Sequence, residues 1–183
     1  MARQIVLLRG INLGSTNRLP MPKLRKALED AGFEDVQTYL QSGNVVLSSS
    51  DSAARLAHAC ERLIKKEFGL EIPAVVRTRA QLAQVVKRNP LGKVAKSPKR
   101  YQVSFLEKKP SAALVRKLEG VAAPSERVVA HGREIYAWHP EGVARSKLWA
   151  ALAGKGLGVT ATARNWTTVT KLLELADDVP SSN

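Results

Sequence analysis

Three short polar clusters in this sequence contain residue types that bind small anions. The first cluster, residues 10–14 (GINLG), follows an apolar run and precedes a predicted helix, which is the position of a phosphate-binding loop. It has neither the spacing of a dinucleotide-binding loop nor the Lys-Ser/Thr pair of a nucleoside-triphosphate loop. An anion site and an ordinary strand-to-helix turn both fit these residues, and we favour the turn.

The other two clusters lie further along the chain. Residues 42–44 (SGN) present a hydroxyl and an amide, but the sequence has no G-x-S-x-G elbow for a serine nucleophile, so a turn is favoured. Arg164 and Asn165 stand at the start of a predicted helix over residues 163–176, where free backbone N–H groups attract anions. Trp166 falls on the apolar stripe of that helix and is expected to pack in the core.

These clusters motivate the first function hypothesis, which is binding of a small anionic or phosphorylated ligand in a cleft between two modules. Polar residues at the ends of secondary-structure elements are the usual material of such a site. The residues expected to line the cleft are Arg9, Asn12, Ser42, Asn44, Arg164 and Asn165.

No catalytic residue can be named from the sequence. We find neither a Ser/His/Asp set nor a pair of carboxylates that stands out from the surface acids, so whether the protein is an enzyme stays open. The histidines His58, His131 and His139 have no partner ligand at metal-site spacing, so neither a metal nor a cofactor is expected.

Positive charge is concentrated in one part of the chain. The net charge is +13, and residues 79–109 hold nine Lys/Arg against a single acid, Glu107, a net of +8. The residues before this segment carry a net of +3 and those after it +2. The basicity therefore belongs mainly to a helix and linker rather than to either folded half.

This basic segment motivates the second hypothesis, non-specific binding of a polyanion such as nucleic acid. A sheet that binds single-stranded RNA stacks bases on aromatic residues of its central strands, and residues 5–8 and 45–47 contain none. This argues against sequence-specific single-strand binding by the first module and leaves phosphate contacts open. The alternative is a solvated linker whose charge serves solubility. The candidate contact residues are Lys87, Arg88, Lys93, Lys96, Lys99 and Arg100.

A third hypothesis is a protein-interaction module, which an exposed apolar patch would favour. We expect no membrane partner, because no run approaches the roughly 20 apolar residues of a membrane span. A signal-peptide core is also absent from the N-terminal residues, so we expect a cytoplasmic protein. The single cysteine, Cys60, excludes an intramolecular disulfide.

Apolar periodicity and turn residues predict an α+β fold of two small modules. Residues 1–78 predict the order β-α-β-β-α-β of a ferredoxin-like split βαβ. Residues 79–100 predict a helix and the basic linker, and residues 101–183 predict β-α-β-β-α followed by a C-terminal helix. Because the two halves repeat the same order of elements, they are expected to be structural relatives.

Four separated stretches resemble one protein family. They are residues 7–14 (LLRGINLG), 38–47 (TYLQSGNVVL), 132–148 (GREIYAWHPEGVARSKL) and 162–172 (TARNWTTVTKL). In this order they resemble the uncharacterised bacterial proteins grouped as domain of unknown function 1697. The resemblance implies two α+β modules, the first similar to a ferredoxin-like fold, and it implies no activity. The load of Lys and Arg between residues 87 and 109 departs from the family pattern.

Overall fold

The computed structural model describes residues 1–178, and these residues divide into two compact units. Unit 1 consists of residues 1–84 together with the residues from 171 on, and unit 2 consists of residues 85–170. Both divisions fall within helices, α3 (Arg79–Arg88) and α6 (Trp166–Asp177). The predicted domain boundaries at residues 78 and 100 stay predictions.

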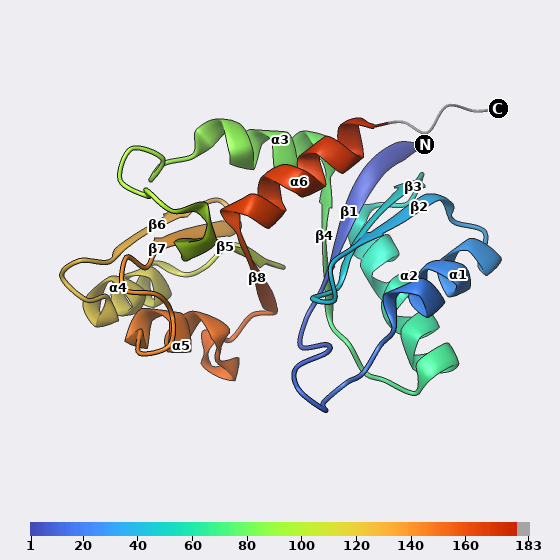
Figure 1. Ribbon diagram of the computed structural model, residues 1–183, viewed down its shortest axis with the longest axis horizontal. Helices are drawn as coiled ribbons and strands as arrows, with labels where there is room; N and C mark the ends of the chain where they lie inside the picture. Colours follow the sequence, from blue (N-terminus) through green and yellow to red (C-terminus); the bar gives the residue numbers. More distant parts are fainter. Residues whose placement is uncertain (179–183) are drawn as a thin grey trace. The chain divides into compact units, whose positions relative to one another are not determined.

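Unit 1 has the expected β-α-β-β-α-β order and then enters α3. Its strands are antiparallel and lie in the order β2-β3-β1-β4, which is the arrangement of a ferredoxin-like split βαβ (Figure 1). The elements before α3 are β1 (Ala2–Leu8), α1 (Met21–Asp30), β2 (Glu34–Tyr39), β3 (Asn44–Ser49), α2 (Ala53–Phe68) and β4 (Ala74–Thr78).

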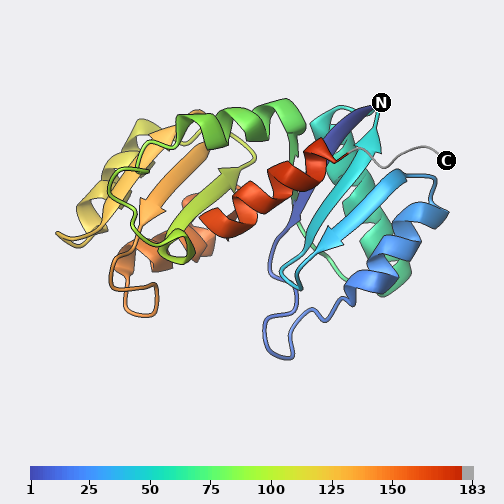
Figure 2. The same cartoon turned by 45° about the horizontal axis from the view of Figure 1, so that its top comes forward.

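The helices α1 and α2 cover one face of this sheet (Figure 2). Pro22 lies in the first turn of α1, where a missing N–H costs no helical hydrogen bond. The Ser52 side chain caps α2 by accepting from the Arg55 N–H, and Gly69 ends α2 with a φ of 68°. The core between helices and sheet contains Val6, Leu8, Leu24, Leu28, Val45, Leu47, Leu56 and Ile64.

Unit 2 repeats the same order of elements. Its sheet is antiparallel in the order β6-β7-β5-β8, and α4 and α5 cover one face of it (Figure 1). The α+β fold class with two modules and a C-terminal helix is thus confirmed. The elements are η1 (Pro98–Arg100), β5 (Tyr101–Leu106), α4 (Ala112–Val121), β6 (Arg127–His131), β7 (Glu134–Trp138), α5 (Lys147–Ala153), η2 (Lys155–Leu157) and β8 (Ala161–Asn165).

The strand β8 is the main difference from the sequence prediction. Residues 163–165 were expected in the last helix, but they pair with β5 and α6 starts only at Trp166. That prediction was wrong because the residues here have no strong local preference for either helix or strand. Pairing with the neighbouring strand β5 then decides their conformation. The Asn165 side chain accepts from the Thr168 N–H at 2.9 Å and so caps α6.

Two buried arginines occupy equivalent positions in the sheets of the two units. Arg77 in β4 pairs with Ile5 of β1, and Arg164 in β8 pairs with Val103 of β5. Each arginine is the fourth residue of its strand and donates from Nη1 to the carbonyl of the preceding residue, at 3.1 and 2.8 Å respectively. The two halves are therefore related in strand order and in register.

Within residues 1–178, no helix is both long and apolar enough to cross a membrane. Cys60 is a free, buried thiol in the core of unit 1. Burial raises the pKa of this thiol to about 12, so it has little thiolate character at neutral pH.

Candidate functional site

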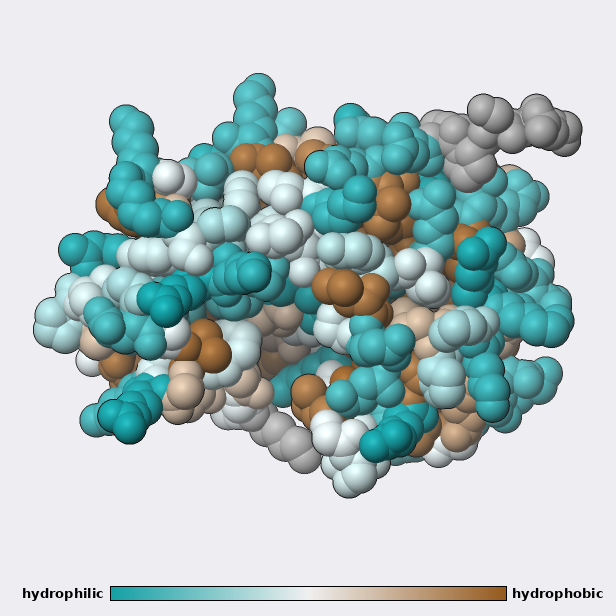
Figure 3. Space-filling model, in the orientation of Figure 1, coloured by the Kyte–Doolittle hydropathy of each residue, from teal (hydrophilic) through white to brown (hydrophobic). Residues whose placement is uncertain are grey.

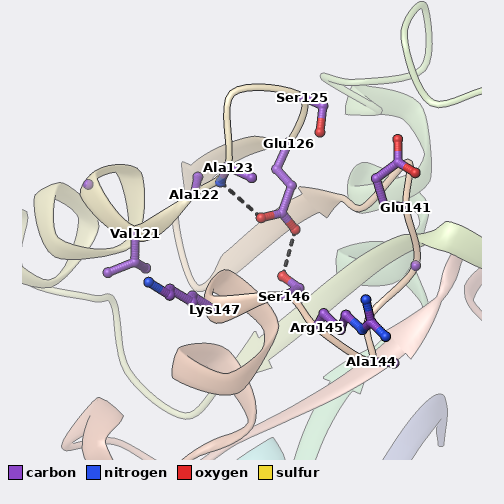
Figure 4. A pocket seen from close by; sticks show the side chains of 12 residues that line it. Val121, Ala122, Ala123, Ser125, Glu126, Glu141, Ala144, Arg145, Ser146 and Lys147 are labelled. Atoms are coloured by element: carbon purple, nitrogen blue, oxygen red, sulfur yellow. Dashed lines mark hydrogen bonds between the residues drawn. The ribbon is translucent and has the colours of Figure 1, made fainter.

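Unit 2 contains an open pocket of about 840 Å³ between the end of α4 and the segment that follows β7 (Figure 4). This volume falls in the range of sites for small organic ligands. Its lining combines small apolar residues with charged and hydroxyl side chains. The lining residues are Gly120, Val121, Ala122, Ala123, Ser125, Glu126, Glu141, Gly142, Ala144, Arg145, Ser146 and Lys147.

Glu126 forms the polar centre of the pocket wall. Its Oε2 accepts a hydrogen bond from Ser146 Oγ at 2.6 Å, and its Oε1 accepts one from the Ala123 N–H at 3.0 Å (Figure 4). The same Oε2 also accepts from His139 Nδ1 at 2.5 Å. Burial raises the pKa of Glu126, but the hydrogen bonds from Ser146, Ala123 and His139 together lower it by more than burial raises it. The resulting pKa therefore lies below its ordinary value. Glu126 is therefore a carboxylate at neutral pH and accepts hydrogen bonds only.

His139 lies behind this carboxylate and is completely buried. Because Glu126 only accepts, His139 Nδ1 carries the proton between them. The ring meets Trp149 edge to face at 5.9 Å, and His139 Nε2 is buried with no hydrogen-bond partner in the described part of the chain. His139 thus holds the wall of the pocket rather than lining it.

Ser146, His139 and Glu126 do not have the arrangement of a nucleophilic triad. In such a triad the serine hydroxyl contacts Nε2 while the acid contacts Nδ1. Here the Ser146 hydroxyl lies beside Nδ1 at 3.3 Å, donates to Glu126 and accepts from the Trp149 N–H at 3.0 Å. The hydroxyl is committed to capping α5, so these residues build a rigid wall and do not activate a nucleophile.

Two cations at the pocket are available to a ligand. Arg145 and Lys147 are exposed, and neither forms an ion pair with an acidic side chain within residues 1–178. In Figure 4, Lys147 extends toward Val121 of α4, whereas Arg145 lies on the side of Glu141. Since Glu126 is already occupied by three donors, the side chains that remain for a ligand are net positive.

In unit 1, the predicted ligand residues mainly tie loops together. Asn12 donates from Nδ2 to the Leu19 and Gln41 carbonyls at 3.0 and 2.7 Å, and its Oδ1 accepts from the Leu19 N–H at 2.8 Å. Asn44 is fully buried and donates to the Tyr39 carbonyl and to Ser42 Oγ. These bonds fix the 10–14 loop against the 40–44 turn.

The remaining predicted residues of the first hypothesis are distributed between the units. Arg9 follows β1 in unit 1, where its N–H donates to the Pro73 carbonyl. Arg164 and Asn165 belong to unit 2, and Arg164 is buried and donates from Nη1 to Thr162 Oγ1 at 2.6 Å. Burial lowers the pKa of Arg164 to about 10. A single cleft built from all six residues stays a prediction.

The six residues predicted to contact a polyanion are all exposed on unit 2. Arg100 donates to the Pro140 carbonyl, and Arg88 hydrogen-bonds Tyr136. The other four, Lys87, Lys93, Lys96 and Lys99, have no ion pair with any described acidic residue. Their side chains therefore extend into solvent.

For a protein-interaction module, the structure offers few large exposed apolar side chains in its described residues. The large ones are Met1, Leu13, Leu40 and Val94. Single exposed apolar residues are normal on protein surfaces, so this hypothesis stays a prediction. No group of three or more His, Cys, Asp or Glu side chains is placed to hold a metal ion within residues 1–178.

The sequence did not indicate the group formed by Glu126, His139 and Ser146. Two of its members lie inside a stretch that carries the family resemblance, residues 132–148, but Glu126 lies outside it. A signal was available in the hairpin: Arg127 pairs with Trp138, so the residues that flank this pair come together. Recognising this group from the sequence would require the pairing register of β6 and β7, which the sequence alone does not define.

Comparison with known proteins gives a family and a fold. The model of a family described as "Protein of unknown function (DUF1697)" matches residues 1–136, so it ends within β7 and before the 141–147 wall of the pocket. The structure is similar to that of the conserved bacterial protein SP0830 from Streptococcus pneumoniae, with a TM-score of 0.77 and 21% identity over 96% of this chain and 98% of that chain. No curated protein matches the sequence at a significant level.

Proposed function

We propose that this chain, which belongs to the DUF1697 family of proteins of unknown function, is a cytoplasmic bacterial protein that binds a small anionic or phosphorylated ligand in the unit 2 pocket. The family description names no activity, so the proposal proceeds from the pocket residues. The observation that carries it is the presence of Arg145 and Lys147 at a pocket of about 840 Å³ without acidic partners in the described chain.

The chemistry of the lining supports an organic anion over a bare ion. Two cations bind a phosphate or carboxylate group through charge-assisted hydrogen bonds. The apolar side chains of Val121, Ala122 and Ala144 offer a surface for the carbon part of such a ligand. The Glu126 carboxylate, held in place by three donors, keeps this wall fixed before the ligand arrives, which reduces the ordering cost of binding.

The proposal is tested by titrating the full chain with adenosine monophosphate and, separately, with adenosine, its uncharged counterpart. We expect the amide NMR signals of residues 120–126 and 141–147 to shift with the phosphorylated probe and to shift far less with adenosine. The variant Arg145→Gln/Lys147→Gln should bind about tenfold more weakly or worse, since one charge-assisted bond contributes about 1.5–3 kcal/mol.

The matched control removes the same charge elsewhere in unit 2. Arg116 and Lys117 on α4 are exposed, carry no ion pair with a described acid and do not line the pocket. The variant Arg116→Gln/Lys117→Gln should keep the wild-type affinity. Equal losses in both variants, or shifts confined to other residues, would contradict the proposal.

A further inference from the structure

A second surface of unit 2 is separate in sequence from the pocket and is defined by residues 87–100 at the end of α3, in the loop after it and in η1. This stretch holds four lysines and two arginines, and no acidic residue occurs from residue 79 to residue 106. We call it the basic loop surface. In Figure 3, hydrophilic side chains in teal protrude along the edge that α3 and the following loop occupy in Figure 1.

Most of the charges on this surface are not neutralised by ion pairs with described acidic residues. All six cations are exposed, and four of them, Lys87, Lys93, Lys96 and Lys99, make no ion pair with a described acid. By contrast, Lys26 on α1 forms an ion pair with Asp30 at 2.8 Å, and Lys65 on α2 forms one with Glu71 at 2.7 Å. The basic loop surface therefore maintains a concentrated positive field.

The scaffold beneath the loop holds it in one place. Leu91 is buried, and its N–H donates to the Tyr101 hydroxyl at 3.4 Å. Turn hydrogen bonds follow from Val94 and Ala95 to the Leu91 carbonyl, at 3.0 and 2.8 Å. A loop anchored in this way presents its cations with less ordering cost than a free tail.

We infer that the basic loop surface binds the phosphate backbone of double-stranded nucleic acid without reading its sequence. Duplex DNA carries about one negative charge per 1.7 Å of helix axis, a higher linear charge density than a single strand. Lysines that contact its phosphates therefore release more counterions from a duplex than from a single strand. Base stacking requires exposed aromatic rings, but residues 87–100 contain none, and Tyr101, which follows them, is buried.

Other polyanions fit this surface less well. Attachment to a membrane surface ordinarily adds aromatic or leucine side chains on one helix face. The residues from 87 to 100 contain no aromatic side chain, and their large exposed apolar residue is Val94 alone. Specific protein–protein interfaces usually bury large aromatic or apolar side chains at their centre. This exposed, lysine-rich loop offers no such cluster.

The test measures binding of the full chain to a fluorescent duplex of about 20 base pairs across a salt series. The test variant is Lys87→Gln/Lys93→Gln/Lys96→Gln/Lys99→Gln, and the control is Lys23→Gln/Arg62→Gln/Arg116→Gln/Lys117→Gln, which removes the same charge from exposed, unpaired positions elsewhere. Because every substituted residue is exposed, both variants should unfold at the wild-type temperature, which circular dichroism checks.

We expect the test variant to bind the duplex at least about tenfold more weakly, with the slope of log K against log salt reduced by about 0.9 for each lost phosphate contact. The control should keep most of the affinity and slope. Wild-type binding that is independent of salt, or equal losses in both variants, would overturn the inference. So would equally tight binding to polyglutamate or to vesicles of phosphatidylserine and phosphatidylcholine. None of these results depends on ligand binding in the pocket.

Discussion

His139 Nδ1 lies 2.5 Å from Glu126 Oε2, although neither residue belongs to a strand or helix. Glu126 directly precedes β6 and His139 directly follows β7, and these strands pair with Arg127 opposite Trp138. The contact therefore extends the hairpin register by one further pair of residues. It connects the sheet to the wall of the proposed ligand pocket.

Acid should weaken the fold through Glu126. Its folded-state pKa is lowered below the ordinary value of 4.5, so the unfolded chain takes up a proton more readily than the folded chain. The stabilisation is complete above pH 4.5 and is lost as the pH falls through the folded-state pKa. We expect Glu126→Gln to lower the free energy of unfolding by about 1–3 kcal/mol at neutral pH and by clearly less in acid. Urea denaturation at both pH values measures this difference, and an equal loss at both would contradict it.

The hydroxyl of Ser146 should contribute more stability than an ordinary helix cap. Ser111 and Ser146 both cap helices, accepting from the Leu114 and Trp149 N–H groups, but only Ser146 also donates to Glu126. We expect Ser111→Ala to cost about 1 kcal/mol, the value of a cap. Ser146→Ala should cost about 2–4 kcal/mol, because a hydrogen bond to a charged group is lost as well. Chemical denaturation compares the two variants, and equal costs would show that the bond to Glu126 contributes nothing.

Gly43 should be far less replaceable than Gly32. Both adopt a φ of +90°, which disfavours any residue with a Cβ. A Cβ at Gly43 would lie 2.7 Å from Ile11 Cδ1 and 2.8 Å from Leu8 Cβ, whereas no atom lies within 4 Å of one at Gly32. Gly32→Ala is expected to cost about 1–2 kcal/mol. Gly43→Ala should cost about 1–3 kcal/mol more because of the overlap, as thermal unfolding would measure.

The two equivalent arginines should respond alike to lysine. Arg77 and Arg164 are buried and each uses a guanidinium nitrogen to reach the carbonyl of the residue before it. A lysine cannot reproduce the fork of donors, so we expect each Arg→Lys change to destabilise by about 1–3 kcal/mol. The exposed control Arg116→Lys should stay within about 0.5 kcal/mol of wild type. A neutral result at one buried site alone would show that the register repeat has no energetic counterpart.

Local patterns in the sequence were sufficient for most secondary structure. Alternating apolar residues, the cap at Ser52 and the glycine that ends α2 each act over a few residues, so they are readable without a structure. They were insufficient at Ala163–Asn165, where pairing with β5 overrides a weak local preference. The distribution of charge was also readable, because Lys and Arg at loop positions are nearly always exposed.

The polar clusters were assigned less well, because residue type does not say whether a polar group is already satisfied. Asn12 and Asn44 looked available for a ligand, but their amides bind loop carbonyls seven to 29 residues away for Asn12 and five residues away for Asn44. By itself, the sequence determined the α+β class, the repeated order of elements and the basic segment, all of which follow from short-range patterns. Only the tertiary structure decided that Glu126, His139 and Ser146 meet beside a pocket, because strand register fixes which distant side chains become neighbours.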